Sequence, residues 1–274
     1  MDCVACGSAA VTERPKRTAR GYRRFRCRAC GKQYNERSGG LLNHTHYPSD
    51  VIALVVLWRL RYRLTLRDLT EMFLVRGIVF SHEAVREWAK LAPLLADELG
   101  QRRHGKRGSR GRHWHVDETY LKVRRRWANL YRAIDRDGNL VDTMLSEHRD
   151  MAAVQTFFRS AKAATGITPE RVTTDGHGSY PRAIRSTLGR RVVHRTSAYK
   201  NNGLEQDHRG VKGRTRCMRG FKSFVAAERF CRSYDELRDF LRPRTRHNQS
   251  VPANRCRLIH LRRTTAVLAI LQAA

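Results

Sequence analysis

Asp117 lies in the apolar, strand-like stretch HWHVDETY (residues 113–120), although the chain carries 55 Lys and Arg residues against 25 Asp and Glu residues. A carboxylate in such a stretch is costly to bury unless something neutralises its charge. Two further acids could join it: Asp175, which ends the strand-like run RVTTD, and Glu205, which begins a helical run. Three carboxylates repel one another unless a cation lies between them.

The chemistry of this set is that of a hard divalent cation. Carboxylate oxygens without a neighbouring Cys or His set favour Mg²⁺ or Mn²⁺ over zinc. Two such ions activate an attacking oxygen and stabilise the leaving oxygen of a phosphodiester. Spacing alone leaves simpler interpretations open, because Asp175 before Gly-His-Gly could be a turn residue and Glu205 could favour a helix dipole.

Four cysteines form a second candidate metal site. Cys3-Val-Ala-Cys6 and Cys27-Arg-Ala-Cys30 are two C-x-x-C pairs, each followed by a glycine. Their spacing is typical of a tetrathiolate zinc site, which would be structural because four thiolates leave no open position. The alternative is two redox pairs or disulfides. We predict one structural Zn²⁺ in a zinc-ribbon module over residues 1–40, and no ligand role for the other three cysteines.

The net charge of +30 indicates a polyanionic partner, because neutralised phosphates release condensed counterions. The alternative is a solvated basic surface or attraction to a membrane surface. The most apolar runs, residues 51–58 and 266–271, are shorter than the roughly 18 residues of a membrane span. We therefore expect a cytoplasmic protein, associated with the prokaryotic nucleoid and not with a membrane.

Residues 46–99 have the pattern of a helix-turn-helix domain. Helices are predicted from Pro48-Ser49-Asp50, from the capping box that begins at Thr65, and from the cap Ser81. In a helix-turn-helix the last of these would read DNA, and a plain helical bundle is the alternative. The Gly- and Arg-rich segment 100–112 is interpreted as a linker along the phosphate backbone. The predicted DNA contacts are the exposed side chains of the helix capped by Ser81 and those of this linker: His82, Arg86, Lys90, Arg107, Arg110 and Arg112.

Residues 113–241 read as a mixed α/β domain. Three adjacent strand-like runs are followed by alternating helices and short strands, which predicts the order βββαβαβα of a ribonuclease-H-like sheet covered on both faces. In such a sheet Asp117 lies on the central first strand and Asp175 at the end of a neighbouring strand. The helix of Glu205 could pack across the same edge. Residues 242–274 are expected to be a basic C-terminal tail.

The segments HVDETYLKVRRRWANLYRAID, TTDGHGSYPRAI, YKNNGLEQDHRGVKGR and RGFKSFVAAER occur in this order between residues 46 and 240. Together they resemble the DDE transposases of bacterial insertion sequences, most closely the insertion-sequence six (IS6-like) family. The resemblance implies a ribonuclease-H-like DDE catalytic domain, in which Asp117, Asp175 and Glu205 are the catalytic triad and bind two Mg²⁺ or Mn²⁺ ions. It also implies a preceding helix-turn-helix that recognises terminal inverted repeats.

By the same resemblance the reaction is hydrolytic cleavage that releases a 3′-OH, followed by attack of that hydroxyl on target DNA. The partner is double-stranded DNA, and a homodimer or higher multimer is expected. His208, Arg209 and Lys212 follow Glu205 on its helix and are predicted to contact DNA phosphates, with a solvated surface as the alternative. Two departures are a short Asp175–Glu205 interval and a zinc ribbon that not every member has.

Two alternatives remain at this point. The chain could be a catalytically silent, transposon-derived DNA-binding protein, or a structure-selective nuclease that cuts DNA without joining ends.

Overall fold

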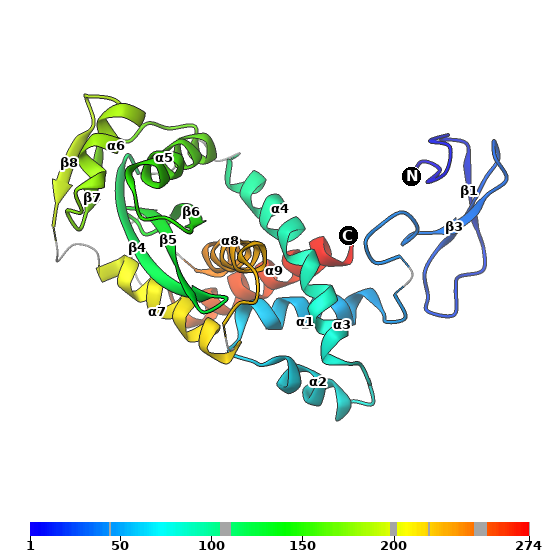
Figure 1. Ribbon diagram of the computed structural model, residues 1–274. Helices are drawn as coiled ribbons and strands as arrows, with labels where there is room; N and C mark the ends of the chain where they lie inside the picture. Colours follow the sequence, from blue (N-terminus) through cyan, green and yellow to red (C-terminus); the bar gives the residue numbers. More distant parts are fainter. Residues whose placement is uncertain (44, 105–110, 198–201, 219, 244–250, 274) are drawn as a thin grey trace.

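The computed structural model describes residues 1–43, 45–104, 111–197, 202–218, 220–243 and 251–273. Figure 1 shows a small three-stranded sheet set apart at one end, a group of helices in the middle and a larger sheet at the other end. None of the helices in these ranges is long and apolar enough to cross a membrane.

The small N-terminal sheet is antiparallel and consists of β1 (Val11–Arg14), β2 (Arg24–Cys27) and β3 (Gln33–Asn35). Its own small core is made by Phe25 and Tyr34 together with two of the cysteines. Gly7 and Gly31 follow the two C-x-x-C pairs at φ of 71° and 73°, a left-handed conformation that glycine adopts without steric cost. The sheet lies within residues 1–40, for which the cysteine spacing predicts a zinc-ribbon module.

The helical region begins with α1 (Ser49–Arg61), α2 (Leu66–Leu74) and α3 (His82–Trp88). Thr65 and Asp68 form the predicted capping box at the start of α2, and the Ser81 side chain caps α3 by accepting from the Ala84 N–H. A single 3₁₀ turn (Ala89–Leu91) then leads into α4 (Ala92–His104).

The predicted linker is partly wrong, because residues 100–104 are the last turns of α4. Leu95 and Leu99 are buried and keep one face of the helix against α8 (Phe224–Leu241), so Gly100 does not end it. Arg112 is exposed just before the next strand. Arg107 and Arg110 lie outside the described residues.

The larger sheet has the order β6-β5-β4-β7-β8, and β4 lies at its centre. Its chain order is βββαβαβα, as predicted, and β4 pairs antiparallel with β5 and parallel with β7. The elements are β4 (His113–Val123), β5 (Arg126–Asp135), β6 (Leu140–Ser146), α5 (Met151–Thr165), β7 (Arg171–Thr174), α6 (Ser179–Thr187), β8 (Val193–Thr196) and α7 (Asn202–Cys217).

Helices cover both faces of this sheet (Figure 1). The even-numbered residues of β4, such as Trp114 and Val116, share a core with α5 and α6. The odd-numbered Leu121 and Val123 belong to a second core with α8 and the helical region. Successive strand residues thus serve different cores, as the period of two requires.

The C-terminal segment is not a tail throughout, because Ala253–Gln272 form helix α9. Its Val267 and Leu271 are fully buried, and α9 packs against α1 and α4. The apolar run AVLAIL supplies the buried face. Residues 244–250, which precede it, lie outside the described residues.

Candidate active site

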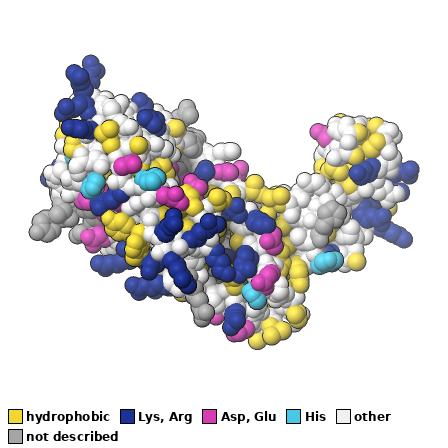
Figure 2. Space-filling model, viewed as in Figure 1, with side chains coloured by type: hydrophobic (Ala, Val, Ile, Leu, Met, Phe, Trp, Pro, Cys, Tyr) yellow, Lys and Arg dark blue, Asp and Glu magenta, His cyan; other side chains and the backbone are white. Residues whose placement is uncertain are grey.

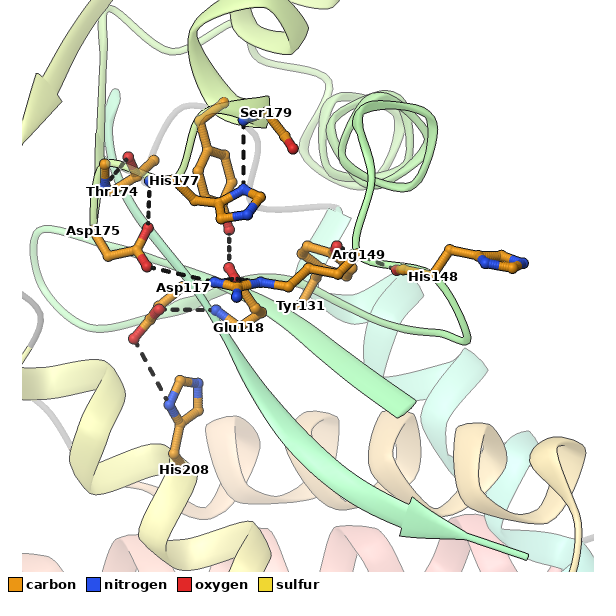
Figure 3. A network of polar contacts seen from close by, with 12 residues as sticks. Asp117, Glu118, Tyr131, His148, Arg149, Thr174, Asp175, His177, Ser179 and His208 are labelled. Atoms are coloured by element: carbon orange, nitrogen blue, oxygen red, sulfur yellow. Dashed lines mark hydrogen bonds and ion pairs between the residues drawn. The ribbon is translucent and has the colours of Figure 1, made fainter. Parts of the chain in front are cut away.

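The fold brings two of the three predicted acids together. Asp117 lies in the middle of β4, and Asp175 follows the last residue of the parallel neighbour β7. Gly176 then turns the chain at φ 96°, and a Cβ there would meet the Thr196 side chain at 3.4 Å. Because β7 ends beside β4, the Asp175 carboxylate lies next to that of Asp117 (Figure 3).

Glu205 lies in the first turn of α7, as predicted, but outside this close group. The carboxylates whose oxygens come within 4.8 Å of one another, among the described residues, are those of Asp117, Glu118 and Asp175. Glu205 is exposed and pairs with the Arg209 guanidinium at 3.9 Å. It is close enough for its negative charge to raise the pKa of Asp117.

Glu118 is the acid that the sequence interpretation missed. Strand alternation points it to the face opposite Asp117, toward α5 and α6. Its buried carboxylate accepts a hydrogen bond from Arg149 Nε at 2.5 Å and another from the Tyr180 hydroxyl. Arg149 also pairs with Asp175 at 3.9 Å, so one cation joins the two acids (Figure 3). The signal in the sequence is the Asp-Glu pair itself.

The electrostatics of the site show unbalanced negative charge around Asp117. Burial, followed by the neighbouring charges of Glu118 and Asp175, raises the pKa of Asp117 to about 7. The hydrogen bond from the Glu118 N–H, at 2.9 Å, opposes this rise without cancelling it. A bound cation would offset the neighbouring negative charges, and carboxylate oxygens are the donors that suit a hard divalent ion.

His208 does not lie where the sequence interpretation placed it. On α7 the position three residues after Glu205 faces the sheet, so the imidazole is buried, and its Nδ1 is 3.9 Å from Asp117 Oδ2. Burial and the charges of Arg132 and Lys212 lower the pKa of His208 to about 3, which keeps the ring neutral. The predicted phosphate contact by His208 is therefore not possible in this conformation.

A buried ion network holds α7 below the acids. Arg132 of β5, the register partner of Asp117, donates to Asp235 of α8 at 2.6 Å and pairs with Asp207 of α7 at 3.6 Å. Arg238 of α8 pairs with the other oxygen of Asp207 at 2.5 Å. The two carboxylates and two guanidinium groups join three elements, so they fix the part of α7 next to Glu205.

The cysteine cluster has the geometry of a tetrathiolate site. The Sγ atoms of Cys3 and Cys30 are 3.6 Å apart, and so are those of Cys6 and Cys27. Four sulfurs at about 2.3 Å from one zinc ion would stand roughly 3.8 Å from each other. All four ligand atoms lie within 4.8 Å, so the cluster fits one ion.

The predicted DNA contacts outside the site are mostly exposed. His82, Arg86 and Lys90 lie on the surface of α3 and the following turn, where Glu83 and Glu87 pair with them. Arg112 pairs with Glu170 at 3.0 Å. Arg209 and Lys212 are exposed on α7, and Figure 2 shows Lys and Arg side chains gathered in this part of the surface.

The solved structures that match this chain include two with low similarity. The simian T-cell lymphotropic virus intasome with PP2A regulatory subunit B56 gamma matches at a TM-score of 0.39 and 18% identity, covering 57% of this chain and 56% of that chain. The Mos1 strand transfer complex matches at a TM-score of 0.35 and 13% identity, covering 82% and 78%.

Sequence comparison is more specific. Residues 111–243 match a family model described as a DDE domain. The transposase for insertion sequence-like element IS431mec of Staphylococcus aureus strain Mu50 is 34% identical over 176 residues, which are 62% of this chain and 76% of the relative. The transposase for insertion sequence element IS257 in transposon Tn4003, also of Staphylococcus aureus, matches with the same identity and coverage. The chain therefore belongs to the insertion-sequence six family of DDE transposases.

Proposed function

We propose that this transposase binds the terminal inverted repeats of its element and cleaves a DNA strand to release a 3′-OH. That hydroxyl then attacks a phosphodiester of target DNA, so that the element strand is joined to the target and the target strand leaves with a free 3′-OH. The observation that carries the proposal is the meeting of Asp117 and Asp175 at the end of β7. Within a DDE domain, these two acids occupy the centre of the sheet and the end of its parallel neighbour.

The proposed catalytic set is Asp117, Asp175 and Glu205, which would hold two Mg²⁺ or Mn²⁺ ions. Their carboxylate oxygens suit such ions. Burial and the charges of Glu118 and Asp175 raise the pKa of Asp117, and a cation would balance those charges. When bound, the ions supply activation of the attacking oxygen and stabilisation of the leaving oxygen. Glu205 would complete the set by a small movement of its side chain or of the first turn of α7.

The remaining residues of the site position these groups. Arg149 joins Glu118 to Asp175 and limits the repulsion between them. The neutral His208 fills the space behind Asp117 without offering it a positive charge. Arg209 and Lys212 are exposed beside Glu205 and would hold DNA phosphates.

The other modules would hold the DNA. We propose that Cys3, Cys6, Cys27 and Cys30 bind one structural Zn²⁺, and that the α2–α3 pair reads the repeats through His82, Arg86 and Lys90. Arg107, Arg110 and Arg112 would contribute phosphate contacts. Assembly of two or more copies on paired ends, in the nucleoid, belongs to the same proposal.

The test is a strand-transfer assay on duplex DNA that carries the repeats flanking this gene, with Mg²⁺ or Mn²⁺. Replacing Asp117 or Asp175 with Asn, or Glu205 with Gln, should abolish both cleavage and joining while DNA binding persists. Full activity after Asp117→Asn contradicts the proposal. Cleavage without joining would identify a nuclease, and binding without cleavage by the unaltered chain would identify a silent DNA-binding protein.

A further inference from the structure

Two aromatic side chains lie exposed on the hairpin that β4 and β5 form. Trp127 is 62% exposed and Tyr120 is 43% exposed, and their ring centroids are 6.3 Å apart at an angle of 76°. The other three tryptophans of the chain, Trp58, Trp88 and Trp114, are buried or half-buried. Two large aromatic rings exposed side by side are typical of a surface that binds a partner or ligand.

The hairpin that carries the rings is held in place. Its turn residues Arg124 and Arg125 have φ of 49° and 66°, a left-handed conformation that is costly for side chains other than glycine and needs support from the surroundings. The Arg124 N–H donates to the Phe221 carbonyl at 2.9 Å, and its Nε donates to the Lys222 carbonyl at 2.8 Å. The connection between α7 and α8 therefore fixes the rings before any ligand arrives.

The guanidinium group of Arg149 connects the aromatic rings to the acids of the candidate active site. Arg149, which bonds Glu118 and pairs with Asp175, also lies over the Tyr120 ring at 5.7 Å. Tyr120 follows Asp117 by three residues on the same strand, a separation of roughly 10 Å along β4. Bases stacked at about 3.4 Å per nucleotide would cover this distance in about three nucleotides.

The charges around the rings suit a nucleic-acid strand. The Lys122 ammonium lies 5.2 Å from the centre of the Trp127 ring, and Arg124, Arg125 and Arg126 are exposed beside it. This density of positive charge opposes contact between this surface and the same surface of a second copy. In duplex DNA the base faces are already stacked, whereas an unpaired base offers a free face to an aromatic ring.

We propose that Tyr120 and Trp127 form a stacking platform for an unpaired base of the DNA end, within about three nucleotides of the phosphate that reacts at the acids. Lys122 and the turn arginines bind the phosphates that flank this base. The inference rests on the proposed function, because it assigns a subsite to the same DNA.

The experiment compares binding of a blunt duplex with binding of the same duplex carrying a three-nucleotide overhang, 3′ or 5′, by fluorescence anisotropy without added Mg²⁺ or Mn²⁺. The unaltered chain should prefer an overhang by about tenfold, which corresponds to about 1.4 kcal/mol. Trp127→Leu should lose this preference and Trp127→Phe should keep most of it. Arg209→Gln is the control, because it removes a proposed phosphate contact beside Glu205 and not at the platform, and it should weaken both DNAs equally.

Intrinsic fluorescence gives a second readout. The overhang DNA should quench tryptophan emission in the unaltered chain and have little effect in Trp127→Leu, because the other tryptophans are shielded. An unchanged circular dichroism spectrum and melting temperature would show that the variant is folded.

Several outcomes separate the inference from the proposed function. If the unaltered chain binds neither DNA, the proposed function fails. If it binds both DNAs equally, or if Trp127→Leu keeps the preference for the overhang, the platform is wrong and the proposed function stands. A change of oligomeric state in Trp127→Leu, with the preference intact, would assign the rings to a contact between copies and likewise overturn the proposal.

Discussion

The folded chain disfavours the charged form of the Asp117 carboxylate. Its pKa of about 7 lies above the ordinary 3.8, so the folded state keeps a proton that the unfolded chain has lost between these values. Without divalent cations, the free energy of unfolding should therefore fall as the pH rises from about 4 to 7. The penalty is complete above pH 7 and amounts to at most about 4 kcal/mol.

Urea unfolding without added divalent cations at pH 4.5 and pH 8, done on the unaltered chain and on Asp117→Asn, measures this effect. The Asn variant should be the more stable at pH 8, and the difference should shrink at the lower pH. Mg²⁺ at pH 8 should stabilise the unaltered chain more than the variant. Identical pH profiles for the two proteins would contradict the assignment of the charge penalty to Asp117.

Glu118 should affect strand transfer by holding the Arg149 guanidinium in place. Glu118→Gln removes the charge that holds the guanidinium beside Asp175, so strand transfer should fall by at least about tenfold while DNA affinity stays the same. Arg149→Gln should cause the same loss, and the double variant should be no worse than either single one. Rescue of Glu118→Gln by excess Mg²⁺ would instead make Glu118 a metal ligand.

At the scale of elements, the strand order and the place of Asp117 and Asp175 could be predicted, because strand length, turns and periodicity are local properties of the sequence. Side-chain direction near an edge was harder to predict. Alternation sets Glu118 on the face opposite Asp117, yet the early end of β7 lets both carboxylates approach Asp175. His208 illustrates the same limit, since only the packing of α7 shows that it faces the sheet.

The ends of the helical region also depend on packing between distant segments. α4 continues past Gly100 because Leu99 packs toward α8, and α9 exists because α1 and α4 cover Val267 and Leu271. These partners are more than 100 residues apart in the sequence. Local caps and periodicity carry no information about such contacts, which decide marginal helices.

α7 carries Glu205, and the contribution of the buried ion network to holding α7 in place should be measurable as a change in stability. Asp207→Asn leaves Arg132 and Arg238 without their shared carboxylate, which should destabilise the fold by about 3–5 kcal/mol and lower strand transfer. Arg209→Gln, on the exposed side of the same helix, is the control and should cost about 0–1 kcal/mol. Equal stability of the two variants in urea unfolding would show that the buried network does not anchor α7.

At the scale of the whole molecule, the buried apolar side chains of the described residues form three separate hydrophobic cores. One lies between the large sheet and α5 and α6, a second joins the sheet to the helical region, and the third belongs to the N-terminal sheet alone. The proposed catalytic acids depend on the first two. The N-terminal sheet has only a few buried apolar side chains, so its folding should depend on the metal.

Metal analysis should find about one zinc ion per chain, and Cys27→Ser/Cys30→Ser should lose it, because two of the four thiolates are gone. Cys217→Ser is the control, since Cys217 lies far from the cluster on α7 and its replacement should leave the zinc content unchanged. A chelator should unfold the N-terminal sheet in a separate, early transition and leave the main transition near its original temperature. A full zinc content in the double variant, or a single transition that shifts as a whole with the chelator, would show that the N-terminal sheet does not fold around a tetrathiolate ion.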